Sequence, residues 1–454
     1  MERRQRFQDV PVLKVSVRGV KVELETSSHN LYIDIDIDGS FHGWKFLPVI
    51  GDCIIDMTEG TLDNTLADRW AFDKTPCFPG DKSIPSHVTS DDLADFFKTG
   101  ATGYIGGSVF AALARKHPEY DLTVLLRKPP ANFKSQFPDV KLIQGSFDDS
   151  DIIAEAAASA DIVIHSGDGD HENALNSIIT GMLRHDSKSY LIKLSGTGTL
   201  YEYPDTTEYL GRINPKIYSD IDDIKELVSR PDNALHRRTD AIVFKAAAEH
   251  GNRLKTAIVC PPDIYGRGCG PGRRASYYIP WFVEAIKKLG KPFYLQDGSN
   301  MRGWVHIDDF VQIYISLVEA AVAGGGSVSW GREVRNSYLI LFLSYLLFMV
   351  FQLNIYKGYF LAASQEASQR DIAEATAKIL FAKGEISSAD AQSISNEEMA
   401  SLFPDAPYTG FFSFGCNSRS KADRAAKELG HVPKAPSFWD VLESDLMDAI
   451  AATK

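Results

Sequence analysis

The chain has 454 residues, of which 44% are hydrophobic and 24% are charged, and its formal net charge at pH 7 is −12. This length predicts two or three globular units, and the acidic balance argues against nucleic acid as a partner. The five cysteines are scattered without a C-x-x-C pair, so neither a disulfide framework nor a metal site is expected. No apolar stretch follows the basic N-terminus, so we expect no secretory signal and a cytoplasmic protein.

The first 75 residues predict a short, truncated α+β fragment. Alternating apolar residues at 12–17 and 20–24 are typical of a hairpin, and residues 31–37 predict a further strand. The block G-S-F-H-G-W-K-F follows at residues 39–46.

This block gives residues 30–73 a resemblance to the C-terminal end of FAD-dependent amine oxidases of the D-amino-acid and sarcosine oxidase superfamily. In that family the block lies beside the flavin ring. Residues 1–30 contain no glycine fingerprint that could hold the rest of the cofactor, so FAD is not expected to bind. We interpret residues 1–75 as an orphaned flavoprotein fragment.

Residues 76–97 predict a linker, because the segment before residue 91 is rich in Pro, Asp and Ser. Only Phe96 and Phe97 offer an apolar core for a strand before the glycines that follow. The hypothesis is a fusion seam at about residues 95–98, at which most of a first strand has been lost.

The motif Thr99-Gly100-x-x-Gly103-x-x-Gly106 is followed at once by an alanine-rich helix pattern. Glycines at these spacings allow a sharp turn and a close approach of the backbone to a pyrophosphate, which the amides of the helix N-terminus then face. The next predicted strand, 122–126, ends in Arg127 and Lys128. A basic residue there suits the 2′-phosphate of NADP, so NADP is favoured, with NAD as the alternative.

Further buried strands are predicted at residues 140–144, 161–165, 190–194 and 256–260, alternating with helix patterns. The fold class is therefore α/β, with a doubly wound parallel (Rossmann) sheet in residues 98–333. Residues 358–454 predict a last sheet strand and a small C-terminal α/β substrate lobe. Ligands of such sheets lie beyond the carboxyl ends of the strands.

Four motifs carry a family resemblance: T-G-A-T-G-Y-I-G-G, G-S-F-D-D, P-P-D-I-Y-G-R-G and R-G-W-V-H-I-D-D-F. Residues 98–454 resemble the atypical extended short-chain dehydrogenase/reductases, which include the NAD-dependent epimerases and dehydratases. The resemblance implies cofactor contacts from Thr99, Gly100, Thr102, Gly103, Tyr104, Ile105, Gly106, Arg127, Asp148, Ser166, Lys245, Pro261 and Tyr265. It implies catalytic roles for Lys245, Ser195 and Thr197, and contacts with a small-molecule substrate from Arg302 and Tyr201.

The chain departs from this family at its Tyr-x-x-x-Lys motif, in which the lysine lowers the pKa of a proton-transferring tyrosine. Lys245 matches the lysine, but the residue four positions earlier is Ala241, and no tyrosine of the chain has a lysine four residues later. One interpretation is an atypical NADP-dependent oxidoreductase with a proton donor from elsewhere, such as Tyr201, Tyr203 or Tyr218. The alternative is a non-catalytic NADP(H)-binding redox sensor or regulator.

Residues 334–357 interrupt this resemblance, and residues 338–353 are almost unbroken apolar. A helix of that length reaches ~24 Å, short of the ~30 Å hydrocarbon core of a bilayer. The favoured interpretation is a translated, unspliced intron, and a membrane segment or an added buried helix are the alternatives. A membrane is a partner only if 338–353 spans it, and a homodimer is left open.

Overall fold

The computed structural model describes residues 12–17, 20–27, 30–37, 95–331 and 356–452, apart from residues 186 and 405. The chain divides into two compact units, residues 1–87 and 88–454. In the first unit, β1 (Val12–Val17), β2 (Val20–Ser27) and β3 (Asn30–Ile37) pair in order as antiparallel neighbours. This confirms the predicted hairpin and its third strand. The flavoprotein-like block at 39–46 and the apolar segment 338–353 lie outside the described residues.

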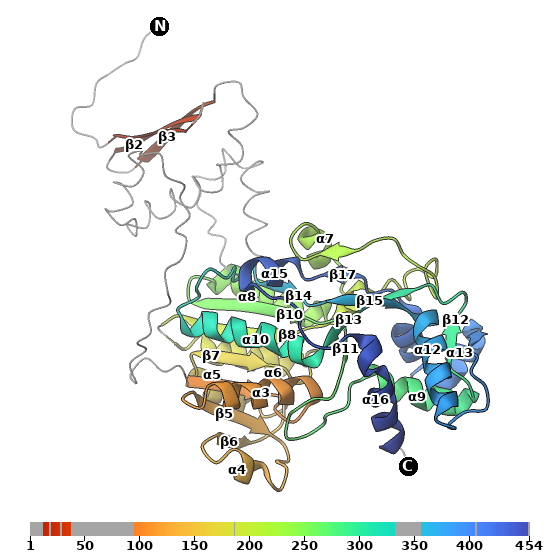
Figure 1. Cartoon of the computed structure of the whole chain (residues 1–454). Coiled ribbons are helices and arrows are strands. Elements are labelled where there is room, and N and C mark those ends of the chain that lie inside the picture. The colour runs from red at the N-terminus through yellow and green to blue at the C-terminus, as the bar shows by residue number, and fades with distance from the viewer. Residues whose placement is uncertain are drawn as a thin grey trace. The chain divides into compact units, whose positions relative to one another are not determined.

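The second unit is built on a seven-stranded sheet in which every neighbouring pair of strands is parallel. Its order is β14-β10-β8-β7-β4-β5-β6, so the chain reverses direction across the sheet between β4 and β7 (Figure 1). This is the doubly wound order of a Rossmann sheet, as predicted. The strands are β14 (Tyr359–Leu361), β10 (Leu254–Cys260), β8 (Ser189–Leu194), β7 (Ile162–His165), β4 (Asp95–Thr99), β5 (Asp121–Leu126) and β6 (Lys141–Gln144).

Strand β4 is complete and central, contrary to the expectation of a strand largely lost at a seam. Residues 95–99 pair with β5 and residues 96–99 with β7, so the predicted linker ends before residue 95. Two polar residues finish this buried strand. Lys98 donates from Nζ to Oγ of Ser166 at 2.5 Å, and a hydrogen bond of 2.8 Å joins Oγ1 of Thr99 to Nδ1 of His165.

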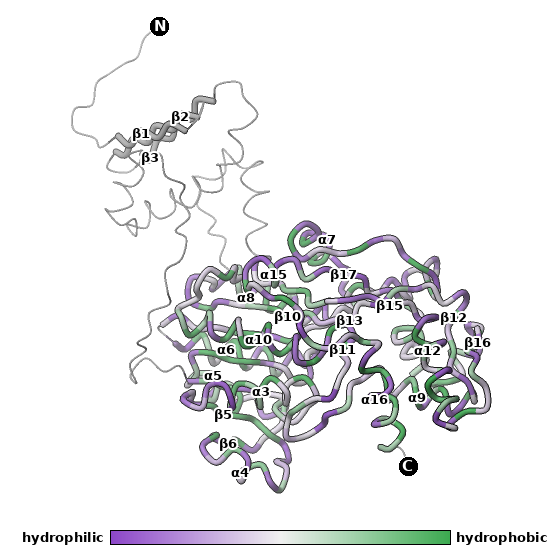
Figure 2. Tube along the Cα trace, viewed as in Figure 1, coloured by the Kyte–Doolittle hydropathy of each residue, from purple (hydrophilic) through white to green (hydrophobic). Residues whose placement is uncertain are grey.

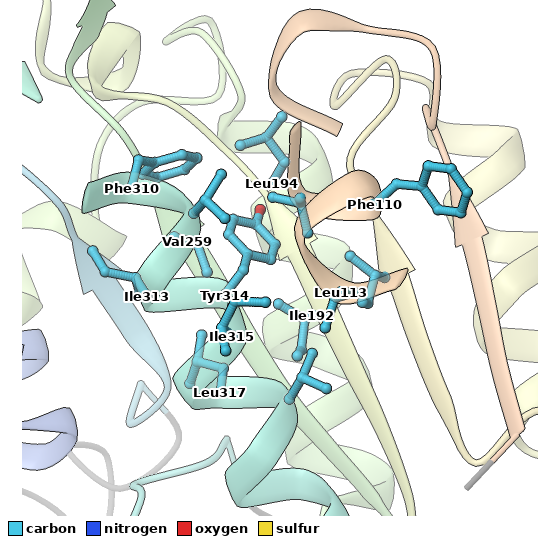
Figure 3. Close-up of a cluster of buried hydrophobic side chains, with 14 of the residues drawn as sticks. Phe110, Leu113, Ile192, Leu194, Val259, Phe310, Ile313, Tyr314, Ile315 and Leu317 are labelled. Atoms are coloured by element: carbon cyan, nitrogen blue, oxygen red, sulfur yellow. The ribbon is translucent and has the colours of Figure 1, made fainter. Parts of the chain in front are cut away.

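Helices cover both faces of the sheet (Figure 1). On one face, α3 (Tyr104–Lys116) and α10 (Ile307–Val322) pack against Ile192, Leu194 and Val259 of β8 and β10 (Figure 3). The opposite face is covered by α5 (Ser150–Ala158), α6 (Glu172–Met182) and α8 (Arg237–His250). Apolar residues concentrate along the central strands and the inner sides of these helices (Figure 2). The remaining short elements around the sheet are α4 (Phe133–Gln136), η3 (Thr197–Leu200), β9 (Tyr218–Ser219), α7 (Ile224–Val228), β17 (Ser420–Lys421) and α15 (Asp423–Leu429).

A smaller lobe with its own buried core lies at one end of the unit (Figure 1). Ser368 caps α12 (Gln369–Ala382), accepting a hydrogen bond from the amide of Asp371, as its sequence spacing predicts. The lobe is joined to the sheet by β11 (Asp263–Tyr265), β13 (Met301–His306) and β15 (Gln365–Ser368). Its other elements are α9 (Tyr278–Leu289), β12 (Phe293–Leu295), α12 (Gln369–Ala382), β16 (Gln392–Ile394), α13 (Asn396–Leu402), α14 (Pro407–Gly410), η5 (Phe411–Gly415) and α16 (Phe438–Ala451).

Within the described ranges, no helix is long and apolar enough to cross a membrane.

Candidate functional site

The glycine motif forms a tight turn between β4 and α3. Gly100 has φ +75°, and its carbonyl accepts a hydrogen bond from the amide of Gly103 at 3.0 Å. A Cβ on Gly106 would lie 2.3 Å from the carbonyl oxygen of Gly100 and 2.7 Å from that of Ser166. A Cβ on Gly103 would meet only the Gly100 oxygen, at 3.4 Å. Two glycines are therefore required by packing, whereas Gly103 leaves the backbone open on its outer side.

This turn fits the pyrophosphate of a dinucleotide. Gly103 is the N-cap of α3, no side chain caps this helix end, and its first turn carries no acidic residue. The amides at the helix N-terminus thus have no side-chain cap and no carboxylate of the first turn competing for them, as a helix start that binds an anion requires. Arg127 is exposed after β5, and Asp148 is exposed after β6, so both lie at the carboxyl ends of neighbouring strands.

A cavity of about 370 Å³ begins at the start of α3 and continues along the ends of β8 and β10 to the small lobe. Its lining thus combines the start of α3, two strand ends, the start of α8 and the lobe. The lining residues are Tyr104, Ile105, Gly196, Thr197, Gly198, Tyr201, Leu235, His236, Pro261, Pro262, Asp263, Ile264, Tyr277, Tyr278, Thr409, Phe412 and Ser413.

The two hydroxyls predicted as catalytic have different environments. Thr197 lines the cavity. Ser195 instead donates from Oγ to Oδ2 of Asp240 at 2.8 Å, and Nζ of Lys193 lies 2.6 Å from Oδ1 of the same carboxylate. All three of these side chains are buried. Ser195 therefore belongs to a closed polar network behind the strand end.

A second buried network lies beneath the glycine turn. His165 is fully buried, and desolvation together with the charges of Lys193 and Lys98 lowers its pKa to about 3. Burial also lowers the pKa of Lys98 to about 7. These groups hold β4 and β7 together at the point where the sheet order reverses. Ser166, predicted as a cofactor contact, receives the Lys98 hydrogen bond and donates to the carbonyl of Thr99 at 3.3 Å.

His236 lies directly before α8 and faces the loop that follows β8. A Cβ on Gly196 would lie 2.8 Å from its Nε2 atom, and one on Gly198 would lie 3.5 Å from it. Its Nδ1 atom lies 2.9 Å and 3.0 Å from the carboxylate oxygens of Asp170, in the loop after β7. Burial raises the pKa of Asp170, but the hydrogen bond from His236 and the charges of His236 and Lys193 outweigh it and hold this pKa below its ordinary value.

Lys245 is not brought together with these groups. Its side chain is 74% exposed on α8 and lies 3.9 Å from Glu249, one helical turn further on. The residues of α8 that face the strand end are instead Thr239, Asp240 and Val243, all buried.

Arg302 and Tyr265 serve packing in this structure. Arg302 is 1% exposed, donates from Nε to Asp263 at 2.6 Å, and donates from Nη2 to the phenol of Tyr201 at 2.9 Å. Its Nη1 group donates to the carbonyl oxygens of Phe412 and Cys416. Tyr265 donates to the carbonyl of Pro436 at 2.7 Å. These contacts tie the small lobe to the sheet.

Sequence reasoning missed His236, Asp170, Asp240 and Lys193. A signal was present, because His236 and Asp240 have the four-residue spacing of the family's tyrosine and lysine, five positions before the expected pair. Asp170, by contrast, lies in a loop, and nothing in its sequence neighbourhood points toward α8.

The sheet order, the glycine turn and the strand-end cavity define a dinucleotide-binding α/β protein of the extended short-chain dehydrogenase/reductase type. Residues 99–330 match the model of the NAD dependent epimerase/dehydratase family. The chain belongs to this family, which confirms the resemblance drawn from its motifs.

Individual relatives and solved structures support this family assignment. The chain is 29% identical over 362 residues to the oxidase ucsJ of Acremonium sp, covering 76% of this chain and 95% of that protein. It is 24% identical over 232 residues to a dTDP-glucose 4,6-dehydratase of Mycobacterium tuberculosis, covering 46% and 64%. Among solved structures, a Thermotoga maritima UDP-glucose 4-epimerase with UDP-glucose shares the fold (TM-score 0.51, 14% identity, 79% of this chain and 100% of that one). A Streptomyces venezuelae dTDP-glucose 4,6-dehydratase with NAD bound does so too (TM-score 0.50, 16% identity, 78% and 95%).

Proposed function

We propose that the chain is a nicotinamide-dinucleotide-dependent oxidoreductase that acts on a carbonyl or alcohol carbon of a small molecule. The observation that carries this proposal is the single cavity that joins the start of α3, the end of β8 and the small lobe. Such a cavity would place the nicotinamide half of a dinucleotide, whose pyrophosphate lies at the neighbouring glycine turn, beside a substrate. The nicotinamide, when bound, supplies the hydride chemistry.

Different residues of the chain would contact the pyrophosphate, the nicotinamide and the substrate. The turn at Gly100, Gly103 and Gly106 and the N-terminus of α3 would hold the pyrophosphate. Thr197 would offer its hydroxyl to the substrate oxygen, and Pro261 would lie beside the nicotinamide. Tyr277 and Phe412 face the same cavity from the lobe side and would contact the substrate.

Arg127 is the residue from which we infer a preference for NADP. It is exposed at the carboxyl end of β5, where a dinucleotide's adenosine ribose lies in this fold. Its guanidinium would pair with the 2′-phosphate in bidentate fashion.

A second candidate function is a non-catalytic NADP(H)-binding sensor. It is favoured by the absence of any Tyr-x-x-x-Lys pair in the sequence and by Ser195 being engaged with Asp240. In that case the cavity would bind the dinucleotide without turnover.

Fluorescence titration of the full-length chain with NADPH and with NADH tests the proposal. We expect micromolar binding of NADPH and at least tenfold weaker binding of NADH, with this preference lost in Arg127→Gln. A panel of carbonyl and alcohol substrates, followed at 340 nm, then separates the two functions. Failure of both dinucleotides to bind would overturn the proposal, and binding without turnover of any substrate would favour the sensor.

A further inference from the structure

The start of α8 carries two titratable residues with the same four-residue spacing as the tyrosine and lysine of the family, five positions earlier in the chain. The residues are His236 and Asp240, four apart, and they point to different places. Asp240 is directed into the protein, toward Ser195 and Lys193. His236 is directed toward the loop after β8, where glycines at 196 and 198 leave room for its ring, and it lines the cavity.

Asp170 fixes the chemical form of this histidine. The carboxylate oxygens of Asp170 lie 2.9 Å and 3.0 Å from Nδ1 of His236 and accept a hydrogen bond from it. A carboxylate on Nδ1 holds a neutral imidazole in the tautomer whose Nε2 atom carries a lone pair. The lone pair of Nε2 then faces the Gly196 side of the cavity. This arrangement is that of a histidine prepared to accept a proton.

The backbone of His236 supports the same view. Its φ of +66° is in the left-handed region, which only His236 and Gln296 occupy among the non-glycine residues of the described ranges. Such conformations are strained and collect at functional sites.

Of the three tyrosines considered as substitute proton donors, Tyr203 packs against Phe411 outside the cavity lining, and burial raises its pKa. The phenol of Tyr201 accepts a hydrogen bond from Arg302, and burial raises its pKa. The pKa of Tyr218 is raised by burial to about 12. On the cavity wall, the phenols of Tyr104 and Tyr278 donate to the carbonyl of Gly266 and the side-chain oxygen of Gln369. The remaining phenol there is Tyr277, which is 52% exposed, with burial raising its pKa and a hydrogen bond to Ser413 lowering it.

We propose that His236, held by Asp170, exchanges the proton of the substrate oxygen in place of the tyrosine of the family. The inference rests on the proposed function. In the oxidative direction the O–H bond of the substrate alcohol breaks and its proton forms an N–H bond at Nε2. The hydrogen on the carbinol carbon leaves with its electron pair to the oxidised nicotinamide dinucleotide. The products are a carbonyl compound, the reduced dinucleotide and an imidazolium beside Asp170, which returns its proton to solvent; reduction runs the same steps backward.

His236→Asn is the decisive variant, because asparagine tolerates the left-handed backbone and cannot accept the proton. We expect single-turnover rates to fall by ~10²–10⁴-fold at unchanged NADPH affinity. Asp170→Asn, which alters a positioning residue, should lower the rate less. The matched control is Arg238→Ala, two residues further on and 74% exposed, which should leave rate and affinity unchanged.

A readout independent of activity is the ring ¹⁵N spectrum of His236, assigned by its loss in His236→Asn. We expect the Nδ1–H tautomer in the wild type and a shift toward Nε2–H in Asp170→Asn. The inference is overturned if His236→Asn turns over substrate within threefold of wild type, if Tyr277→Phe alone abolishes turnover, or if the wild-type ring is Nε2–H. A chain that binds dinucleotide but turns over nothing also overturns it. Absence of dinucleotide binding identifies instead a failure of the proposed function.

Discussion

Nζ of Lys193 lies 2.6 Å from Oδ1 of Asp240, and both side chains are buried behind the end of β8. Oδ2 of the same carboxylate accepts a hydrogen bond from Ser195. The lysine comes from the strand and the carboxylate from α8, so the pair fixes the start of that helix against the sheet. His236 precedes this helix, and its position therefore depends on the pair.

The pair predicts a large and asymmetric response to mutation. Asp240→Ala leaves the Lys193 ammonium buried without a partner, and we expect the free energy of unfolding to fall by about 3–5 kcal/mol. Replacing both residues, as Lys193→Met with Asp240→Leu, should recover most of that loss. Urea denaturation measures both effects. The control is Asp121→Asn, which breaks the exposed pair of Asp121 with Lys141 and should cost less than about 1 kcal/mol. Equal losses in the single and double variants would contradict the prediction.

The pKa of Lys98 predicts how stability changes with pH. Burial lowers this pKa from 10.5 to about 7, so between these values the unfolded chain binds a proton that the folded chain does not. Stability should therefore rise with pH across this window, by about 1.4 kcal/mol per pH unit from this residue. In Lys98→Met this contribution disappears, so the variant's gain over wild type should be largest below pH 7 and shrink toward pH 10.

Denaturation at pH 7, 8, 9 and 10 tests this prediction. Neither of two other buried groups adds a folded-state titration above pH 7. The pKa of His165 is lowered to about 3, and burial raises the pKa of Asp220 only to about 7. The exposed Lys141→Met provides the control and should show a difference from wild type that does not vary with pH. A pH-independent gain in Lys98→Met would show that Lys98 is charged in the folded chain throughout.

The parallel sheet and its order could be predicted because the buried strands are short apolar runs that alternate with helix patterns. The prediction that most of strand β4 is lost was wrong, because this strand ends in polar residues rather than in an apolar run. Lys98 and Thr99 look like residues of a strand end, and their burial is explained only by their hydrogen bonds to Ser166 and His165, which lie at the end of another strand, β7. Sequence periodicity carries no information on such partners.

The site was predictable only where backbone geometry dictates the residue. The glycine spacing identified the turn at Gly100 and the start of α3, because no other residue fits there. Side-chain roles were less accessible. Lys245 matched a spacing but is exposed, and Arg302 looked like a substrate contact but is paired with Asp263 inside the protein. The side of a helix that meets a strand end depends on packing that the sequence does not display.

Because Gly106 and Gly103 have different surroundings, we predict that replacing Gly106 lowers stability, whereas replacing Gly103 lowers NADPH affinity. Gly106→Ala would place a methyl group 2.3 Å from the Gly100 carbonyl, so α3 must shift and we expect a loss of at least 2 kcal/mol, of the order seen for overpacked cores. Gly103→Ala meets its nearest neighbour at 3.4 Å and should fold with little loss of stability. Its methyl group would nevertheless occupy the open side of the turn, and NADPH affinity should fall by about tenfold or more.

Thermal denaturation and NADPH titration of the two variants give the comparison. The control is Ala426→Gly on α15, which measures the cost of exchanging alanine and glycine in a helix away from the glycine turn. Gly384→Ala cannot serve as this control, because the φ of +73° at Gly384 disfavours alanine. Gly103→Ala with wild-type NADPH affinity would mean that the dinucleotide does not approach this turn.

The ends of the interrupting segment predict that its removal is tolerated. The amide of Gly331 donates to the carbonyl of Thr256 at 2.9 Å, and a Cβ on Gly358 would lie 2.8 Å from the nitrogen of Gly331. Joining Glu333 to Gly358 would make Gly331 and Gly358 the first and fourth residues of a turn, the fourth being a position that favours glycine. Gly358 has φ +89°, and its carbonyl accepts from the amide of Ile258 at the start of the edge pairing.

We therefore expect the variant lacking residues 334–357 to fold and to bind NADPH as the full-length chain does. Shortening a connection by this length should raise the free energy of unfolding by about 1–2 kcal/mol through the lower entropy cost of closing it. Denaturation and NADPH titration of both chains measure this, and flotation with liposomes tests whether the segment carries the chain to a membrane. A variant that fails to fold would favour the buried-helix interpretation of residues 338–353, and flotation of the full-length chain alone would favour the membrane segment. Folding and NADPH binding by both chains, without flotation of either, is the result that the retained-intron interpretation requires.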